Sequence, residues 1–433
     1  MKMIKRMIGF LTVVAVLLTC IPASMVAGED LIILSDYNDY YGREALEKMP
    51  NATALLYAYD NIAACVEASL ESASVYNGEN YISVYELRIV IDAYLRDYAH
   101  HFWLANTYSY SYIDESRVTR YVPGYLMEGE ELAEAKNDFL AVADEILAKV
   151  DDSMTEYEKE LVIHDELMDR LVYDLEAPNA HNAYGALVEG RTVCEGYAEA
   201  FQYLLHRVGI NSFLIIGSSM GEGHKWNAVR IDGEYYHVDP TWNDQDDTIF
   251  HAYFNVSDEI IEEDHFINTT VYDLPVCDSM DANYFSMNGR TVSADSCTVA
   301  EVAKLIKGNM PNAHVYTDDV DALLTWYKNN VSKIAGELGV VGTFKYGNVT
   351  LGREVVLILD GEIPEPERML GDVDGDGSVT NADVLEIYRY IYNPALYPLD
   401  VETGDVDGDG AVTNADVLEI YRYIYNPALY PIG

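Results

Sequence analysis

The chain alternates between stretches with helical periodicity and shorter stretches in which every second residue is apolar. Residues 85–95 and 130–149 repeat apolar positions at the spacing of an amphipathic helix. Between them, residues 102–112 alternate and are rich in tyrosine, which predicts a strand. We therefore expect an N-terminal region, residues 28–150, that is mostly helical.

Another helix is predicted to begin near residue 155. Thr155 and Glu158 have the spacing of a capping box, in which each side chain binds a backbone amide near the other residue. His164 lies on the apolar face of this helix, which is typical of a packed core histidine rather than a metal ligand. The adjacent pair His100 and His101 also favours a structural role, because neighbouring side chains point in different directions.

The pattern at residues 188–244 is the most informative. Apolar positions between residues 197 and 208 have helical spacing, and Gly209 is a typical residue to end a helix. Cys194 is therefore predicted to lie in the first turn of this helix. Unpaired amides and the macrodipole favour an anion there, so the site favours a thiolate, the nucleophilic form of cysteine. The same amides are suited to hold an oxyanion.

Two alternating runs follow, residues 224–231 and 234–239, separated by Asp232 and Gly233. Asp-Gly is among the strongest signals for a two-residue hairpin turn. In that register Trp226 pairs with Asp239, so His224 lies on the same face as Asp239 and diagonally across from it. The imidazole is then placed to take the thiol proton, and the carboxylate to orient and stabilise the imidazolium.

Residues 283–360 have the pattern of a small α/β module. Asn288 and Gly289 predict a hairpin turn, Thr298 and Glu301 have capping-box spacing, and residues 354–359 predict a strand. The acidic segment that follows contains two prolines and lacks periodicity, so residues 361–370 are predicted to be a linker.

The C-terminal segments 371–399 and 404–432 are near copies that differ at positions 378/411 and 399/432. Each begins with alternating aspartates at the spacing of an EF-hand calcium loop, and residues 384–392 and 417–425 then predict one helix each. Carboxylates this close repel one another without a dication, so we expect folding here to depend on Ca²⁺. The expected ligands of two calcium ions are Asp372, Asp374, Asp376, Ser378, Thr380 and Asp383, then Asp405, Asp407, Asp409, Ala411, Thr413 and Asp416.

Composition narrows the choice of partners and location. The formal net charge of −46 argues against nucleic acid and anionic membranes, because a polyanion is repelled. A basic start, an apolar run over residues 7–18 and small residues up to Ala27 predict a secretory signal peptide, and no later segment predicts a transmembrane helix. The cysteines beyond it are too few for a disulfide scaffold, although a Cys277–Cys297 pair stays open.

Three segments together resemble the transglutaminase-like superfamily: 192–198 (TVCEGYA), 223–227 (GHKWN) and 236–242 (YHVDPTW). The resemblance implies a papain-like α/β core in which Cys194 is the nucleophile, His224 the base and Asp239 the orienting carboxylate. It also implies acyl transfer from an amide through a thioester. Lys225 departs from the pattern, since a small residue is common there. The two loop–helix repeats resemble a type I dockerin, which implies a cohesin module on a scaffold or cell surface as partner.

These features predict an α+β protein with six parts. They are a signal peptide (1–27), an N-terminal helical region (28–150), a transglutaminase-like catalytic domain (151–282), a small α/β module (283–360), a linker (361–370) and a dockerin (371–433). We expect a secreted cysteine enzyme of a cellulosome-like complex. The resemblance does not fix the acyl acceptor: water gives a peptidase or amidase, and a lysine amine gives a protein crosslinker. An inactive binding or structural subunit is an alternative, as is an accessory role in polysaccharide breakdown, although no paired-carboxylate motif supports the latter.

Overall fold

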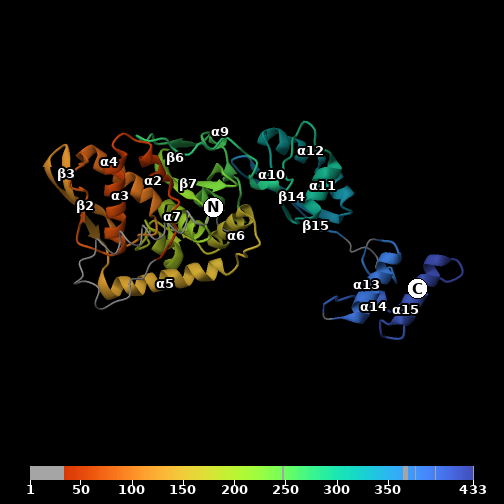
Figure 1. The fold of residues 1–433 in the computed structure, drawn as a ribbon. Helices are drawn as coiled ribbons and strands as arrows, with labels where there is room; N and C mark the ends of the chain where they lie inside the picture. Colours follow the sequence, from red (N-terminus) through yellow and green to blue (C-terminus); the bar gives the residue numbers. More distant parts are fainter. Residues whose placement is uncertain (1–33, 246–247, 364–368, 376, 395, 433) are drawn as a thin grey trace. The chain divides into compact units, whose positions relative to one another are not determined.

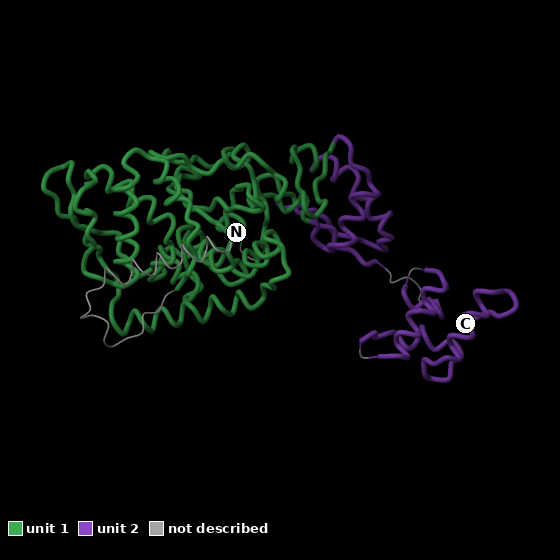
Figure 2. Tube along the Cα trace, viewed as in Figure 1, with its two compact units in different colours: residues 1–294, 314–323, 350–355 green, residues 295–313, 324–349, 356–433 purple. Residues whose placement is uncertain are grey.

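The computed structural model describes residues 34–245, 248–363, 369–375, 377–394 and 396–432 (Figure 1). The predicted signal peptide and Asp376 lie outside these residues. The chain separates into two compact units, one of residues 1–294, 314–323 and 350–355, the other of residues 295–313, 324–349 and 356–433 (Figure 2). Within the described residues, no helix is long and apolar enough to cross a membrane.

The first unit begins with helices that pack on one another and a small antiparallel sheet of order β1-β3-β2. The predicted helices at 85–95 and 130–149 and the predicted strand at 102–112 are confirmed as α4, α5 and β2. The elements are α2 (Tyr41–Glu47), α3 (Ala52–Glu67), β1 (Ala73–Ser74), α4 (Val84–Asp97), β2 (Leu104–Asp114), β3 (Arg117–Tyr125) and α5 (Gly129–Leu147).

A second, antiparallel sheet of order β11-β8-β7-β6-β12 forms the rest of this unit, and α7 packs against β6 and β7 (Figure 1). Its strands are β6 (Ser212–Ser219), β7 (Glu222–Ile231), β8 (Glu234–Val238), β11 (Phe254–Val256) and β12 (His265–Ile267). The other elements are α6 (Glu156–Met168), β4 (Val172–Tyr173), η1 (Gly185–Glu189), β5 (Arg191–Thr192), α7 (Cys194–Arg207), α8 (Pro240–Asn243), β9 (Asp244–Gln245), β10 (Thr248–Ile249), α9 (Asp258–Ile261) and α10 (Tyr284–Met287).

One hydrophobic cluster runs through this unit. It joins buried side chains of the N-terminal region, such as Trp103 before β2 and Phe139 of α5, to buried side chains of α7 and β7, such as Phe201 and Trp226. The predicted capping box at Thr155 is confirmed, since its hydroxyl accepts from the amide of Glu158. The N-terminal helices and the second sheet therefore share a core, while the boundary at residue 150 stays a prediction.

The predicted hairpin at Asn288 and Gly289 is wrong. These residues end helix α10: Asn288 is its C-cap and Gly289 adopts a φ of 61°. A glycine in the left-handed region serves a helix C-terminus as well as a hairpin, so the dipeptide alone does not decide. The capping box at Thr298 and the strand at 354–359 are confirmed. The elements are α11 (Val299–Lys307), β13 (Asn312–Tyr316), α12 (Val320–Glu337), β14 (Val341–Leu351) and β15 (Glu354–Glu362), with sheet order β13-β15-β14.

The C-terminal part contains α13 (Asn381–Tyr392), α14 (Val401–Gly404) and α15 (Asn414–Tyr425). The two predicted helices are confirmed as α13 and α15, and each starts a few residues early because Thr380 and Thr413 form capping boxes with Asp383 and Asp416. Side chains from both repeats share one small core, in which Ile387 and Ile420 are fully buried. The repeats therefore stabilise each other.

Candidate active site and calcium loops

The predicted hairpin places His224 and Asp239 as expected. Strands β7 and β8 pair with Ile231 opposite Glu234 and Asn227 opposite Val238, which is the register set by a two-residue turn. Asp232 and Gly233 both have positive φ, 51° and 98°, as a type I′ turn requires. The turn chemistry therefore fixes which face of the strand carries His224.

Cys194 is the first residue of α7, and its thiol is free. The N-cap residue is Val193, whose side chain caps none of the first-turn amides. The amides and the positive end of the macrodipole are thus directed at the position of the thiol and of a bound carbonyl oxygen. Gly209, just beyond the helix, has a φ of 83° and confirms the predicted C-terminal stop.

Asp239 connects the sheet to the site. It follows β8 directly and caps α8, where its Oδ1 accepts hydrogen bonds from the amides of Thr241 and Trp242. Its Oδ2 lies 2.6 Å from Nε2 of His224. Because Nε2 is engaged by Asp239, Nδ1 is the nitrogen that His224 can offer to Cys194, whose thiol interacts with the imidazole through a side-chain hydrogen bond. The structure thus brings the three predicted residues together.

A second histidine also binds Asp239 and was not predicted. Nε2 of His265, the first residue of β12, lies 3.0 Å from the same Oδ2, and Nδ1 lies 2.5 Å from Oδ1 of Asp264. Rings of Trp226, Trp242 and Tyr253 surround His265 at centroid distances of 5.1, 5.2 and 5.3 Å. Asp239, which is fully buried, is therefore held by four donors.

The charges in this group alternate. Burial disfavours the imidazolium of His224, yet the neighbouring Asp239 carboxylate and the Cys194 thiol raise its pKa to about 10. Burial likewise opposes the imidazolium of His265, but Asp239 and Asp264 raise its pKa. For Asp239, burial favours the neutral acid, and the two histidines outweigh it and lower the pKa. These contacts therefore favour the charged form of the His224 imidazole.

Aromatic residues near the site divide into packed and exposed ones. Trp226, Tyr197 and His237 are buried, so they belong to the core. His237 accepts a hydrogen bond from Nε1 of Trp226 and contacts Asp258 at 2.8 Å. Tyr173, by contrast, is exposed, and its pKa is raised by partial burial and by the nearby Cys194 and Glu222. Tyr173 is therefore an exposed aromatic side chain near Cys194.

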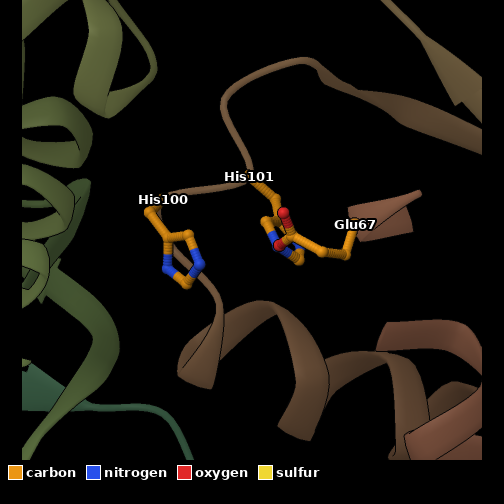
Figure 3. A group of neighbouring side chains, drawn as sticks. All are labelled: Glu67, His100 and His101. Atoms are coloured by element: carbon orange, nitrogen blue, oxygen red, sulfur yellow. The ribbon is translucent and has the colours of Figure 1, made fainter. Parts of the chain in front are cut away.

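Other histidines form buried networks. Glu67 and His101 lie side by side, with His100 nearby (Figure 3). Glu67 accepts hydrogen bonds from Nε2 of His101 at 2.9 Å and from Nζ of Lys136 at 3.4 Å. Nδ1 of His101 lies 2.7 Å from the Tyr94 hydroxyl. A metal ion here would have to displace both a proton and an ammonium group, which agrees with the structural role predicted for His100 and His101.

His164 is fully buried, as predicted, and its partners lead to the site. Its Nδ1 lies 2.8 Å from Asp165, and its Nε2 lies 3.1 Å from Nδ2 of Asn243. Asn243 is the last residue of α8, and its backbone N–H donates a hydrogen bond to the carbonyl oxygen of Asp239. His164 therefore supports the short helix that Asp239 caps.

The acidic loops bring their carboxylates together. Carboxylate oxygens of Asp372, Asp374 and Asp383 lie within 4.8 Å of one another. Asp383 and its copy Asp416 are fully buried, and their carboxylates accept hydrogen bonds from backbone amides of their own loops. Burial and the surrounding carboxylates raise the pKa of Asp407. Closely packed, partly buried oxygen donors are the set that Ca²⁺ prefers, so these residues fit that ion.

Comparison with known proteins gives two family matches. The Transglutaminase-like superfamily matches residues 141–240, and the Dockerin type I domain matches residues 370–425. Both resemblances predicted from the sequence are thus confirmed. Type I dockerins typically bind calcium, and a dockerin implies a cohesin partner and an extracellular, cellulosome-associated location. No curated protein matches the sequence.

Solved structures give distant matches that span about half to three fifths of the matched chains. A crystal structure of a TGase is 14% identical, with 34% of this chain and 47% of that chain covered and a TM-score of 0.23. A candidate cysteine protease from Cytophaga hutchinsonii is 14% identical, with coverage of 31% and 61% and a TM-score of 0.21. A candidate protease from Parabacteroides distasonis is 8% identical, with coverage of 59% and 61% and a TM-score of 0.23.

Proposed function

We propose that this chain, which carries a transglutaminase-like core domain and a C-terminal type I dockerin domain, is a secreted cysteine enzyme that transfers acyl groups from peptide or amide bonds. The observation that carries the proposal is the hydrogen-bonded set of Cys194, His224 and Asp239. In this proposal the catalytic domain is residues 151–282, has a papain-like arrangement and uses these residues as nucleophile, acid–base and orienting carboxylate.

The proposed reaction starts from a thiolate and an imidazolium. The Cys194 thiolate attacks the amide carbon, and the first-turn amides of α7 stabilise the negative oxygen that forms. His224 then gives its proton to the leaving nitrogen, the C–N bond breaks, and a thioester remains on Cys194. Neutral His224 next takes a proton from the acceptor, whose attack releases the acyl group and restores the thiolate. Asp239 keeps its charge throughout and stabilises each imidazolium.

Hydrolysis is the leading form of this reaction. With water as acceptor the enzyme is a peptidase or amidase, and with a lysine amine it is a protein crosslinker. Both forms use the same three residues, so the distinction rests on what reaches the thioester. An inactive binding subunit needs no charged base, and the elevated pKa of His224 favours an active enzyme over that alternative.

The dockerin determines where this chemistry is delivered. We propose that residues 371–433 bind two calcium ions and dock to a cohesin in a cellulosome-like complex. The proposed ligands are the carboxylates of the two loops with Thr380 and Thr413, together with the backbone carbonyls of Ser378 and Ala411. Bound calcium would neutralise carboxylates that otherwise repel one another and so hold α13 and α15 in place.

One experiment tests the reaction and identifies the acceptor. The mature chain is incubated with proteins of the complex in water enriched in ¹⁸O, beside a Cys194→Ala control. Hydrolysis adds ¹⁸O to new peptide C-termini, whereas crosslinking produces glutamine–lysine linked peptides with loss of ammonia; mass spectrometry detects both. The proposed enzymatic activity would be refuted if the wild type formed neither product and iodoacetamide labelled Cys194 no faster than Cys297.

A further inference from the structure

An ammonium group lies between the helix that carries Cys194 and the strand that carries His224. Lys225 follows His224 on β7, and its Nζ lies 2.5 Å from Oε1 of Glu195 and 3.0 Å from Oε1 of Glu199. Glu195 follows Cys194 directly, and Glu199 lies one turn further along α7. The bridge therefore joins the immediate chain neighbours of the nucleophile and the base.

The geometry of the strand makes this bridge a spacer. Successive side chains of a strand point to opposite faces, so Lys225 and Asn227 face α7 while His224 faces Asp239. Asn227 adds a second link, since its Nδ2 donates to the carbonyl oxygen of Ala198 at 3.0 Å. The two links hold β7 against the first turns of α7, and the Lys225 link lies nearer to the reacting atoms.

The charges of the bridge also matter. The side chains of Lys225 and Glu199 are 15% and 11% exposed. Burial is the main cause that raises the pKa of Glu199 to about 7, and Lys225 opposes it. Burial also opposes the charge on Lys225, but Glu199 and Glu195 raise its pKa. Without the ammonium, two acidic groups would lie beside Cys194, with His181 3.2 Å from Glu195 and the backbone amide of Ala183 at Glu199 as further partners.

We propose that Lys225 is a positioning residue that fixes the spacing of Cys194 and His224 and compensates the acidic pair beside the thiolate. The proposal rests on the proposed cysteine chemistry.

The test measures alkylation of Cys194 by iodoacetamide in the mature chain between pH 5 and 10, read from the mass of the Cys194 peptide. A Cys297→Ser background removes the other accessible thiol, because Cys65 and Cys277 are buried. Lys225→Met should slow alkylation at pH 7 by roughly ten- to thirtyfold and move its midpoint to higher pH, since uncompensated negative charge disfavours the thiolate. Lys225→Arg should restore most of the rate.

Two further variants separate this role from general stability. Lys149→Met removes an ion pair with Glu166 elsewhere in the unit and should leave alkylation unchanged. The triple variant Lys225→Met, Glu195→Gln, Glu199→Gln removes the unpaired charges, so it should fold even where Lys225→Met does not. It should return the pH midpoint to the wild-type value while its limiting rate stays low, because the link is still missing.

The outcomes distinguish this proposal from the proposed function. In the mature chain that keeps Cys297, a Cys194 that reacts no faster than Cys297 defeats the cysteine chemistry itself. A reactive wild type with an equally reactive Lys225→Met variant defeats only the role of Lys225. A triple variant with both the midpoint and the limiting rate of the wild type also overturns the proposal, since spacing would then not depend on the bridge.

Discussion

Replacement of Asp239 by asparagine removes the negative charge of the site and replaces Oδ2, which faces His224 and His265, by an amide nitrogen that cannot accept their hydrogen bonds. Asparagine keeps the oxygen that accepts from the amides of Thr241 and Trp242. It removes the negative charge 2.6 Å from Nε2 of His224, in a fully buried position. Burial disfavours an imidazolium and Cys194 is then the partner that still favours it, so the pKa of His224 should fall from about 10 toward its ordinary value of 6.5. A larger share of His224 would then be neutral at pH 7.

The size of the effect follows from that change. A tenfold change in a protonation equilibrium is worth about 1.4 kcal/mol, so a pKa raised from 6.5 to about 10 corresponds to roughly 5 kcal/mol in favour of the charged ring. Part of this comes from Cys194. The remainder agrees with the ~3–5 kcal/mol that is lost when one partner of a buried ion pair is removed.

The pH dependence has a definite sign. Because the pKa of His224 is raised in the folded state, its contribution to stability is complete below pH 6.5 and is lost as the pH rises through about 10. The pKa of Asp239 is lowered, so its contribution is present above its unfolded value of about 3.9 and is lost as the pH falls through the folded value. The pair therefore stabilises the fold most between about pH 4 and 6.5.

Two measurements check this prediction. Urea unfolding, followed by tryptophan fluorescence, to which the buried Trp226 contributes, should show a gap in unfolding free energy between wild type and Asp239→Asn that is large at pH 6 and small at pH 10. Iodoacetamide labelling of Cys194 at pH 7 should slow by at least tenfold in the variant. An equal stability gap at both pH values, or labelling at the wild-type rate, would refute the reasoning.

Further predictions concern the supports of the site and the dockerin. His265→Gln keeps a donor to Asp239 and should label Cys194 within a few-fold of wild type, whereas His265→Ala should be roughly tenfold slower, as expected for a lost buried hydrogen bond of about 1–1.5 kcal/mol. EDTA should reduce the far-ultraviolet helical signal of α13 and α15 and leave Cys194 labelling unchanged. Gly196→Ala would place a Cβ 1.9 Å from Oγ1 of Thr192 and should cost about 1–3 kcal/mol in thermal unfolding, while Gly223→Ala meets no atom within 4 Å and should change little.

The arrangement of His224 and Asp239 near Cys194 was largely predictable because its signals are local. Asp232 and Gly233 fix the register of β7 and β8, and parity then fixes the face of His224. The helix of Cys194 is bounded by signals in its own sequence, with Gly209 at its end. The approach of Cys194 to His224 is a tertiary contact, and here the order of the three motifs along the chain supplied what the pattern could not.

His265 could not be predicted in the same way. It lies on a strand of three residues that pairs with β6 and that is distant along the chain from both strands of the hairpin. So short a strand has no periodicity to recognise. The one available signal was the adjacent Asp264, which marks a histidine with a carboxylate partner. The contact of Lys225 with Glu195 and Glu199 could not be predicted either. The sequence places the two glutamates on one helix face, but tertiary packing determines which strand lies against that face.

The charge of the whole chain describes the site poorly. A formal net charge of −46 predicts that polyanionic partners are repelled, yet at the site histidine side chains separate the carboxylates. His224 lies between Cys194 and Asp239, and His265 lies between Asp239 and Asp264. Both imidazoles are buried, so water screens their contacts with the carboxylates little, and those contacts favour the charged form of each ring. The composition therefore describes the chain as a whole, while the proposed reactivity of Cys194 rests on the few largely buried imidazole and ammonium groups placed next to it.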